Sequence, residues 1–88
     1  MADAGTMSLG KFIGSEDLNS ASNTGLTVPN DDQGNPARVA VISEASGGNV
    51  GIAFATTEVV HSIPSPIVID SDLESIEVTG DIHVSYFS

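Results

Sequence analysis

The chain has no cysteine and no tryptophan, and it contains a single tyrosine. The lack of cysteine excludes disulfides and thiolate metal sites, which often stabilise domains of this size. At 88 residues, the chain is long enough for one domain whose hydrophobic core is only marginally sufficient. We therefore expect additional stabilisation from oligomerisation or from docking onto a partner.

Basic residues are almost missing, because Lys11 and Arg38 stand against 12 acidic residues and leave a net charge of -10. Charged residues make up 16% of the chain. An average domain has roughly 25%, so the imbalance reflects missing cations more than excess acid. Two cations cannot neutralise a phosphate track or an anionic membrane surface. This excludes nucleic acid and membranes as partners and favours a neutral or basic protein.

No segment has the features of a targeting or membrane-spanning sequence. Residues 1–12, MADAGTMSLGKF, lack a basic region followed by an apolar run. No stretch approaches the ~20 apolar residues of a membrane span. We expect a soluble product made in the cytoplasm. The small, polar residues 1–8 predict a flexible N-terminal arm, and residues 9–88 predict a single small β domain.

Short β-branched runs alternate with turn residues over the second half of the chain. Residues 37–45, ARVAVISEA, predict a strand that is buried on both faces at Val39 to Ile42. SGGN at 46–49 is the best hairpin turn, with residues 50–63 as the returning strand. PSP at 64–66 interrupts pairing, and IVID at 67–70 predicts a further strand. The fold class is therefore all-β, a small antiparallel β-sandwich or barrel.

The first half of the chain gives weaker signals. Residues 8–14, SLGKFIG, and 26–29, LTVP, are compatible with short strands. Residues 15–25, SEDLNSASNTG, are rich in Ser, Asn and Gly and predict a loop. Residues 30–36, NDDQGNP, form the strongest loop signal in the chain.

Residues 75–88, SIEVTGDIHVSYFS, place apolar side chains at even positions and polar side chains at odd positions. Two geometries preserve this alternation: a hairpin with TGD as its loop, or one continuous strand with a bulge or bend at Gly80. We favour the hairpin because Gly-Asp is a turn pair. In both geometries the apolar face seals the sheet. Phe87 lies on the polar face, which suggests contact beyond the domain's own core.

His61 and His83 are the only candidates for a general base, and neither lies in a recognised catalytic motif. We interpret both as surface histidines; the alternatives are a metal site shared with Glu58, or catalysis. We therefore expect no catalytic residue, no cofactor and no metal.

Two acidic loops raise the alternative of a calcium site. One contains Asp70, Asp72 and Glu74, and the other contains Asp31 and Asp32. The residues after Glu74 do not follow the EF-hand pattern, so we interpret both loops as solvated turns.

The overall character of the chain resembles that of a known family. Three parts of the sequence carry this resemblance: the arm at 1–8, the segment NPARVAVISEASGGNVGIAFATTEVV at 35–60 and the β-rich C-terminus. The chain resembles the small, acidic, cysteine-free β proteins that decorate bacteriophage heads. The resemblance implies a homo-oligomer, with a trimer favoured, that sits on the outside of the virion. It also implies that the major capsid protein is the partner and that the oligomer clamps neighbouring capsid subunits.

The sequence thus predicts a structural interaction protein, a capsid decoration or cement protein that stabilises the shell. We expect its partner interface to include five residues: Lys11, Phe12, Arg38, Tyr86 and Phe87. The alternative is a carbohydrate- or receptor-binding module of a fibre or adhesin, for which one tyrosine and three phenylalanines offer few aromatic platforms. A small β-barrel enzyme that uses His61 and His83 is the third hypothesis.

Overall fold

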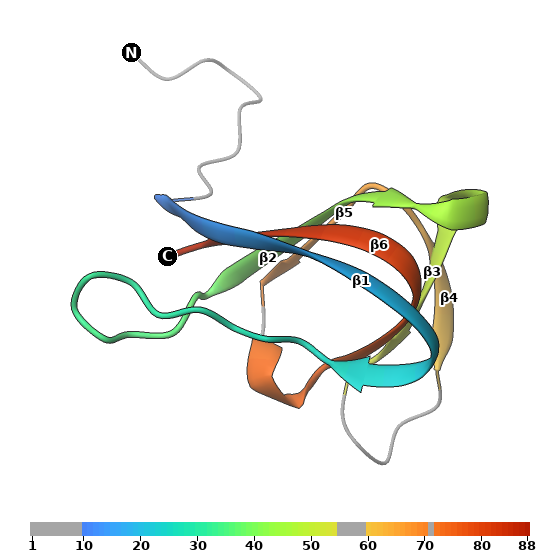
Figure 1. Cartoon of the computed structure of the whole chain (residues 1–88), viewed down its shortest axis with the longest axis horizontal. Helices are drawn as coiled ribbons and strands as arrows, with labels where there is room; N and C mark the ends of the chain where they lie inside the picture. Colours follow the sequence, from blue (N-terminus) through green and yellow to red (C-terminus); the bar gives the residue numbers. More distant parts are fainter. Residues whose placement is uncertain (1–9, 55–59, 71) are drawn as a thin grey trace.

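The computed structural model describes residues 10–54, 60–70 and 72–88 of the chain. The predicted N-terminal arm, residues 1–8, lies outside the described residues. Within them, the chain forms six strands and two single-turn 3₁₀ helices (Figure 1). The strands are β1 (Phe12–Gly25), β2 (Val39–Ala45), β3 (Asn49–Ala53), β4 (His61–Pro64), β5 (Ile67–Asp70) and β6 (Glu77–Phe87), and the helices are η1 (Ser46–Gly48) and η2 (Leu73–Ser75).

The strand β6 lies at the centre of a single antiparallel sheet. One of its edges pairs with β1 along nearly its whole length. Its other edge pairs with β2 over residues 82–87 and with β3 over residues 77–79. The strand β5 then pairs with β2, and β4 pairs with β3. The sheet curls into a half-barrel (Figure 1), which confirms the predicted small antiparallel all-β fold.

The concave face of this sheet holds the hydrophobic core. The even positions of β6 other than Gly80 are buried, as their alternation predicts, with Val84 0% and Tyr86 1% exposed. Ile42 of β2 and Ile52 of β3 are fully buried beside them. Leu26 and Val28 pack against the same core from the segment after β1, although LTVP forms no strand. These contacts let one curled sheet enclose a core without a second layer.

The C-terminal segment is one continuous strand, so the favoured hairpin is wrong. Gly80 lies within this strand where β6 bends: β1 shifts register beside it, and the partner on the other edge changes from β2 to β3. It adopts a φ of 127°, a region that other residues rarely occupy. A hairpin at TGD would pair the two halves of this segment with each other. In the structure both edges of β6 instead pair with other strands, β1 on one side and β2 with β3 on the other.

Residues 15–25, which the sequence predicts as a loop, belong to the strand β1. This correction is larger than that of the C-terminal hairpin, because it adds a whole strand to the sheet. The strand is interrupted by register shifts between Phe12 and Gly14 and between Ser20 and Thr24. The Ser- and Asn-rich composition suits an edge strand with one face in solvent, and pairing with β6 supplies the order that local propensity does not.

The turn at SGGN is present, but it does not form a hairpin. Gly47 and Gly48 adopt φ values of 78° and 83° within or at the end of η1. The strands β2 and β3 pair with successive parts of β6 rather than with each other. The loop predicted at 30–36 is confirmed, and Asp31 closes it by accepting hydrogen bonds from the backbone N–H groups of Gln33 and Asn35.

None of the helices in the described part of the chain has the length and apolar character needed to cross a bilayer.

Replacement of Gly80 by alanine tests the role of this residue in the bend of β6. We expect Gly80→Ala to lower the free energy of unfolding by about 1–3 kcal/mol, because alanine is strained at this φ. An added Cβ would meet only Ile82 Cγ2, at 4.0 Å, so crowding is not the cause. Urea denaturation measures the change. Gly25→Ala is the control, since nothing lies within 4 Å of its added Cβ; equal losses in both variants would contradict this account.

Candidate functional site

Four of the five residues predicted for the partner interface lie at one end of the molecule. Phe12 is paired with Phe87 across β1 and β6, and their rings meet edge to face with centroids 5.7 Å apart. The backbone N–H of Ser88 donates to the carbonyl of Lys11, and that of Arg38 donates to the carbonyl of Phe87, both over 2.9 Å. We call the group formed by Lys11, Phe12, Arg38 and Phe87 the apolar–cationic end.

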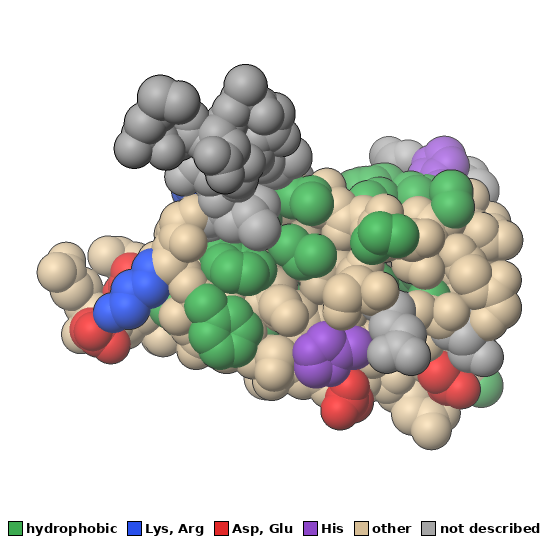
Figure 2. Space-filling view, turned by 90° about the horizontal axis from the view of Figure 1, so that it is seen from above, with side chains coloured by type: hydrophobic (Ala, Val, Ile, Leu, Met, Phe, Trp, Pro, Cys, Tyr) green, Lys and Arg blue, Asp and Glu red, His purple; other side chains and the backbone are tan. Residues whose placement is uncertain are grey.

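The aromatic pair of this end is accessible. Phe12 is 55% exposed, and Phe87 is partly exposed. Val41 and Val68 are paired on the same face of the sheet, and Val68 is 40% exposed. Figure 2 shows hydrophobic side chains gathering on this face of the molecule. An apolar area that the domain leaves uncovered is a marker of contact with another molecule.

Both cations of the chain lie at the same end, each beside a carboxylate. Lys11 Nζ lies 3.3 Å from Asp32 Oδ2, and Arg38 Nη1 lies 3.3 Å from Asp70 Oδ2. All four side chains are at least 60% exposed, so these pairs contribute little to stability. Because the two cations are matched here, the other ten acidic residues of the chain account for its whole net charge of -10.

Tyr86 belongs to the core and not to this surface, which corrects its predicted place in the interface. Its ring lies on the concave face of β6, and its hydroxyl donates to the carboxylate of Glu16 on β1. The same oxygen, Glu16 Oε2, accepts the backbone N–H of Thr27 over 3.0 Å. Burial, together with the hydrogen bond and the negative charge of Glu16, raises the pKa of Tyr86 far above its ordinary value.

A second cluster, which sequence reasoning missed, lies further along the same two strands. Asp17 on β1 faces His83 on β6, with Oδ1 and Nδ1 2.7 Å apart. Asn19 and Asp81 form the next pair, so the four side chains occupy adjacent positions on the outer face of the sheet. They contribute, with Leu18, Ile82 and Ala45, to a shallow hollow of ≈ 450 Å³. Assigning Asp17 to a loop concealed this arrangement.

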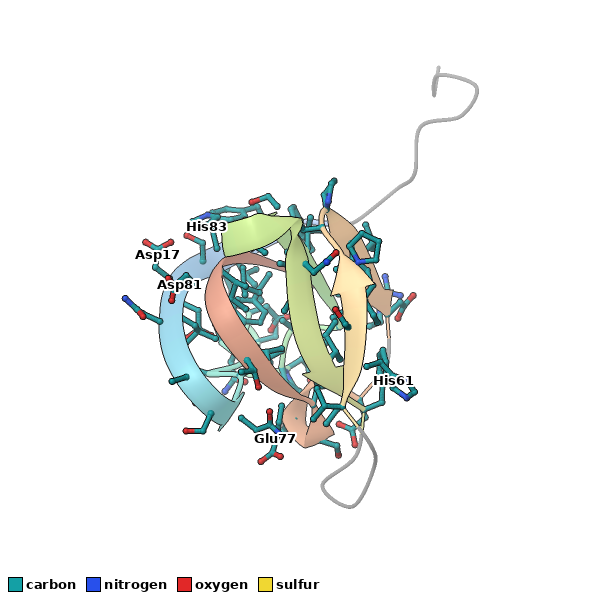
Figure 3. All side chains as sticks on the ribbon, turned by 90° about the vertical axis from the view of Figure 1, so that its right-hand side faces the viewer. Asp17, His61, Glu77, Asp81 and His83 are labelled. Carbon is teal, nitrogen blue, oxygen red and sulfur yellow. The ribbon has the colours of Figure 1, made fainter. Side chains whose placement is uncertain are left out.

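The alternative of a metal site shared by the histidines is not compatible with their positions. Figure 3 shows His83 beside Asp17 and Asp81, whereas His61 lies on the opposite side of the molecule. Glu58, the third residue of that hypothesis, lies outside the described residues. Among residues 10–54, 60–70 and 72–88, no three His, Asp or Glu side chains are placed to hold a metal ion together.

The carboxylates of the two acidic loops are directed to different partners. Asp70 faces Arg38, and Asp72 accepts the hydroxyl of Ser75 over 2.8 Å. Asp31 accepts two backbone N–H groups of its own loop. Together with the ion pair of Asp32 and Lys11, these contacts give four of the five loop carboxylates a partner within the domain.

Comparisons with protein-family models, with curated proteins and with solved structures give no match to this chain.

The pH dependence of stability tests the contact that Tyr86 makes between β6 and β1. The raised pKa in the folded state means that, above the ordinary value of 10.0, the unfolded chain releases this proton while the folded chain retains it. We therefore expect the free energy of unfolding to keep the contribution of this contact in full below pH 10.0 and to fall by about 1.4 kcal/mol per pH unit above it. We expect Tyr86→Phe to lose about 1–2 kcal/mol at neutral pH and to lack the alkaline fall.

Urea denaturation at a series of pH values measures both effects. Tyr86 is the only tyrosine, so the ultraviolet absorbance of phenolate reports its titration directly in the folded chain. An equal alkaline loss in the wild type and in Tyr86→Phe would show that another group is responsible.

Proposed function

We propose that this chain is a structural interaction protein that docks onto a large protein assembly through its apolar–cationic end. The observation that carries the proposal is the ring pair of the exposed Phe12 and the partly exposed Phe87 beside the chain's only two cations. Aromatic side chains and arginine are enriched in the central, energetically dominant contacts of protein interfaces.

The distribution of charge favours this end over other parts of the surface. Each cation is matched by one carboxylate, so the apolar–cationic end is close to neutral while the remaining acidic residues carry the net charge. A protein surface can approach this end without placing unpaired carboxylates in an apolar interface, where unpaired charges are costly. The acidic remainder disfavours nucleic acid and anionic membranes.

The proposed setting is the outside of a virion, where the chain decorates and stabilises the capsid. The partner in this setting is the major capsid protein, and three copies of the chain form one unit. The resemblance to head-decoration proteins is the basis of this assignment. The strongly paired β6 supports it in physical terms, because a stiff sheet transmits load between the subunits that it bridges.

The geometry of the aromatic rings favours a protein partner over a carbohydrate. Sugars stack on the flat face of an aromatic ring, so a sugar site needs a ring that exposes one whole face to solvent. Phe12 and Phe87 instead pack edge to face with an interplanar angle of 68°, and the ring of Tyr86 is buried.

Removal of the exposed ring tests docking. We expect Phe12→Ala to weaken binding to shells of the major capsid protein from the same genome by about 2 kcal/mol or more, roughly thirtyfold in Kd. Its stability should change much less, because the ring is already 55% exposed. Co-sedimentation with empty shells measures binding. Phe54→Ala is the matched control, a phenylalanine 42% exposed at the end of β3; equal binding by both variants would refute the assignment.

The oligomeric state provides an independent check. Light scattering over a range of concentrations should give a discrete species of three times the 9.0 kDa of one chain. A closed trimer is expected to persist on dilution, whereas a nonspecific aggregate would change size continuously. A folded monomer at every concentration would contradict the proposed unit of three copies.

A further inference from the structure

The two edges of the sheet differ in their capacity to accept another strand. At one edge, β4 and β5 are short, and Pro64 and Pro66 lie where the two strands meet. Proline has no N–H group to donate, so it protects an edge from further pairing. At the other edge lies β1, which has 14 residues and contains no proline and no lysine.

Within the described residues, β1 pairs with β6 alone, so its second edge has no partner strand. The pairing of β1 is unbroken from Gly14 to Ser20, between the two register shifts. A regular stretch of this length at a sheet edge presents a row of main-chain donors and acceptors. Such a row is a template for strand addition.

The side chains of this stretch select for positive charge. Asp17 and Asn19 project on the outer face, where they line the hollow together with Asp81 and His83. The strand β1 carries Glu16 and Asp17 but no cation. Since Glu16 is turned to the concave face and bonded to Tyr86, the outer face of the edge is left with Asp17 and, one strand further, Asp81.

We propose that the free edge of β1 from Gly14 to Ser20 binds an extended, proline-free segment of a partner protein with lysine or arginine at alternate positions. Main-chain hydrogen bonds to β1 provide affinity, and the basic side chains reach Asp17 and Asp81 across the hollow. This surface goes beyond the proposed function, because it shares no residue with the apolar–cationic end and does not require docking there.

A seven-residue peptide that alternates lysine with threonine, capped at both ends, is a suitable probe. Titrated into the full ¹⁵N-labelled chain, it should shift the amide signals of residues 14–20 and of the hollow. In a strand, the N–H groups of alternate residues point to opposite edges. N-methylation of all lysine amides, or of all threonine amides, should therefore abolish binding in one case only, by at least tenfold.

Charge recognition is tested by Asp17→Asn, which should weaken the peptide severalfold. Asp72→Asn is the control, because it makes the same chemical change on an exposed residue beyond the N-terminal end of β6. Thermal unfolding checks that both variants remain folded, since Asp17 also contacts His83.

Several results would overturn the proposal. Equal binding of the two methylated peptides, or shifts spread over the acidic surface, would indicate attraction by net charge alone. Equal weakening by Asp17→Asn and Asp72→Asn would indicate the same. No detectable binding of the unmodified peptide would show that the edge is closed.

Discussion

The pairing of β6 with three other strands is the interaction on which the rest of the structure depends. Among the strands that the structure describes, β1 pairs with no other strand, and β2 and β3 are joined to one sheet only through β6. Without it, the described strands would form two separate two-stranded pairs and one isolated strand, and isolated pairs are at best marginally stable in water. The same strand also supplies the largest buried side chain, Tyr86, to the core. In a chain without disulfides, the eleven residues of β6 thus provide both the central main-chain pairing and a large part of the core.

Some of this could be predicted from the sequence because period-two alternation with one buried face is a strong local signal. It identified the buried face of the C-terminal segment, while a β-branched run identified the strand at Val39 and clustered turn residues identified the loop at Asp31. It could not identify β1, whose polar residues are ordered by pairing with β6 rather than by their own propensity. The turn at SGGN was also recognised, but local residues do not specify which strands pair. Hairpin pairing would have been local, whereas β2 pairs with residues 37 to 48 positions away and β3 with residues 24 to 28 positions away.

The same limits apply to the surfaces. Phe87 was identifiable because it breaks the alternation of its strand, and its contact with Phe12 followed from a register that only the fold determines. Tyr86 lies on the apolar side of that alternation, so parity alone assigns it to the core. The pair of Asp17 and His83 joins positions 66 apart in sequence and could not be recognised while Asp17 was assigned to a loop. The register shift after Phe12 separates the two surfaces of β1, leaving its first residue at the apolar–cationic end and its regular stretch at the acidic edge.

The wide sequence separation of β1 and β6 has a consequence for how the chain reaches its fold. Every pairing that joins β1 to the sheet closes most of the chain into a loop. The conformational entropy of this loop is lost before the contacts between β1 and β6 form. Topologies dominated by such non-local contacts fold slowly for their size. During synthesis β1 leaves the ribosome long before β6 does, and until β6 follows, neither edge of β1 is paired with another strand. The strand β1 is polar and rich in serine and asparagine, which is why its sequence predicts a loop. The same composition disfavours aggregation of β1 before β6 is synthesised, whereas a strand of valine and isoleucine would favour it.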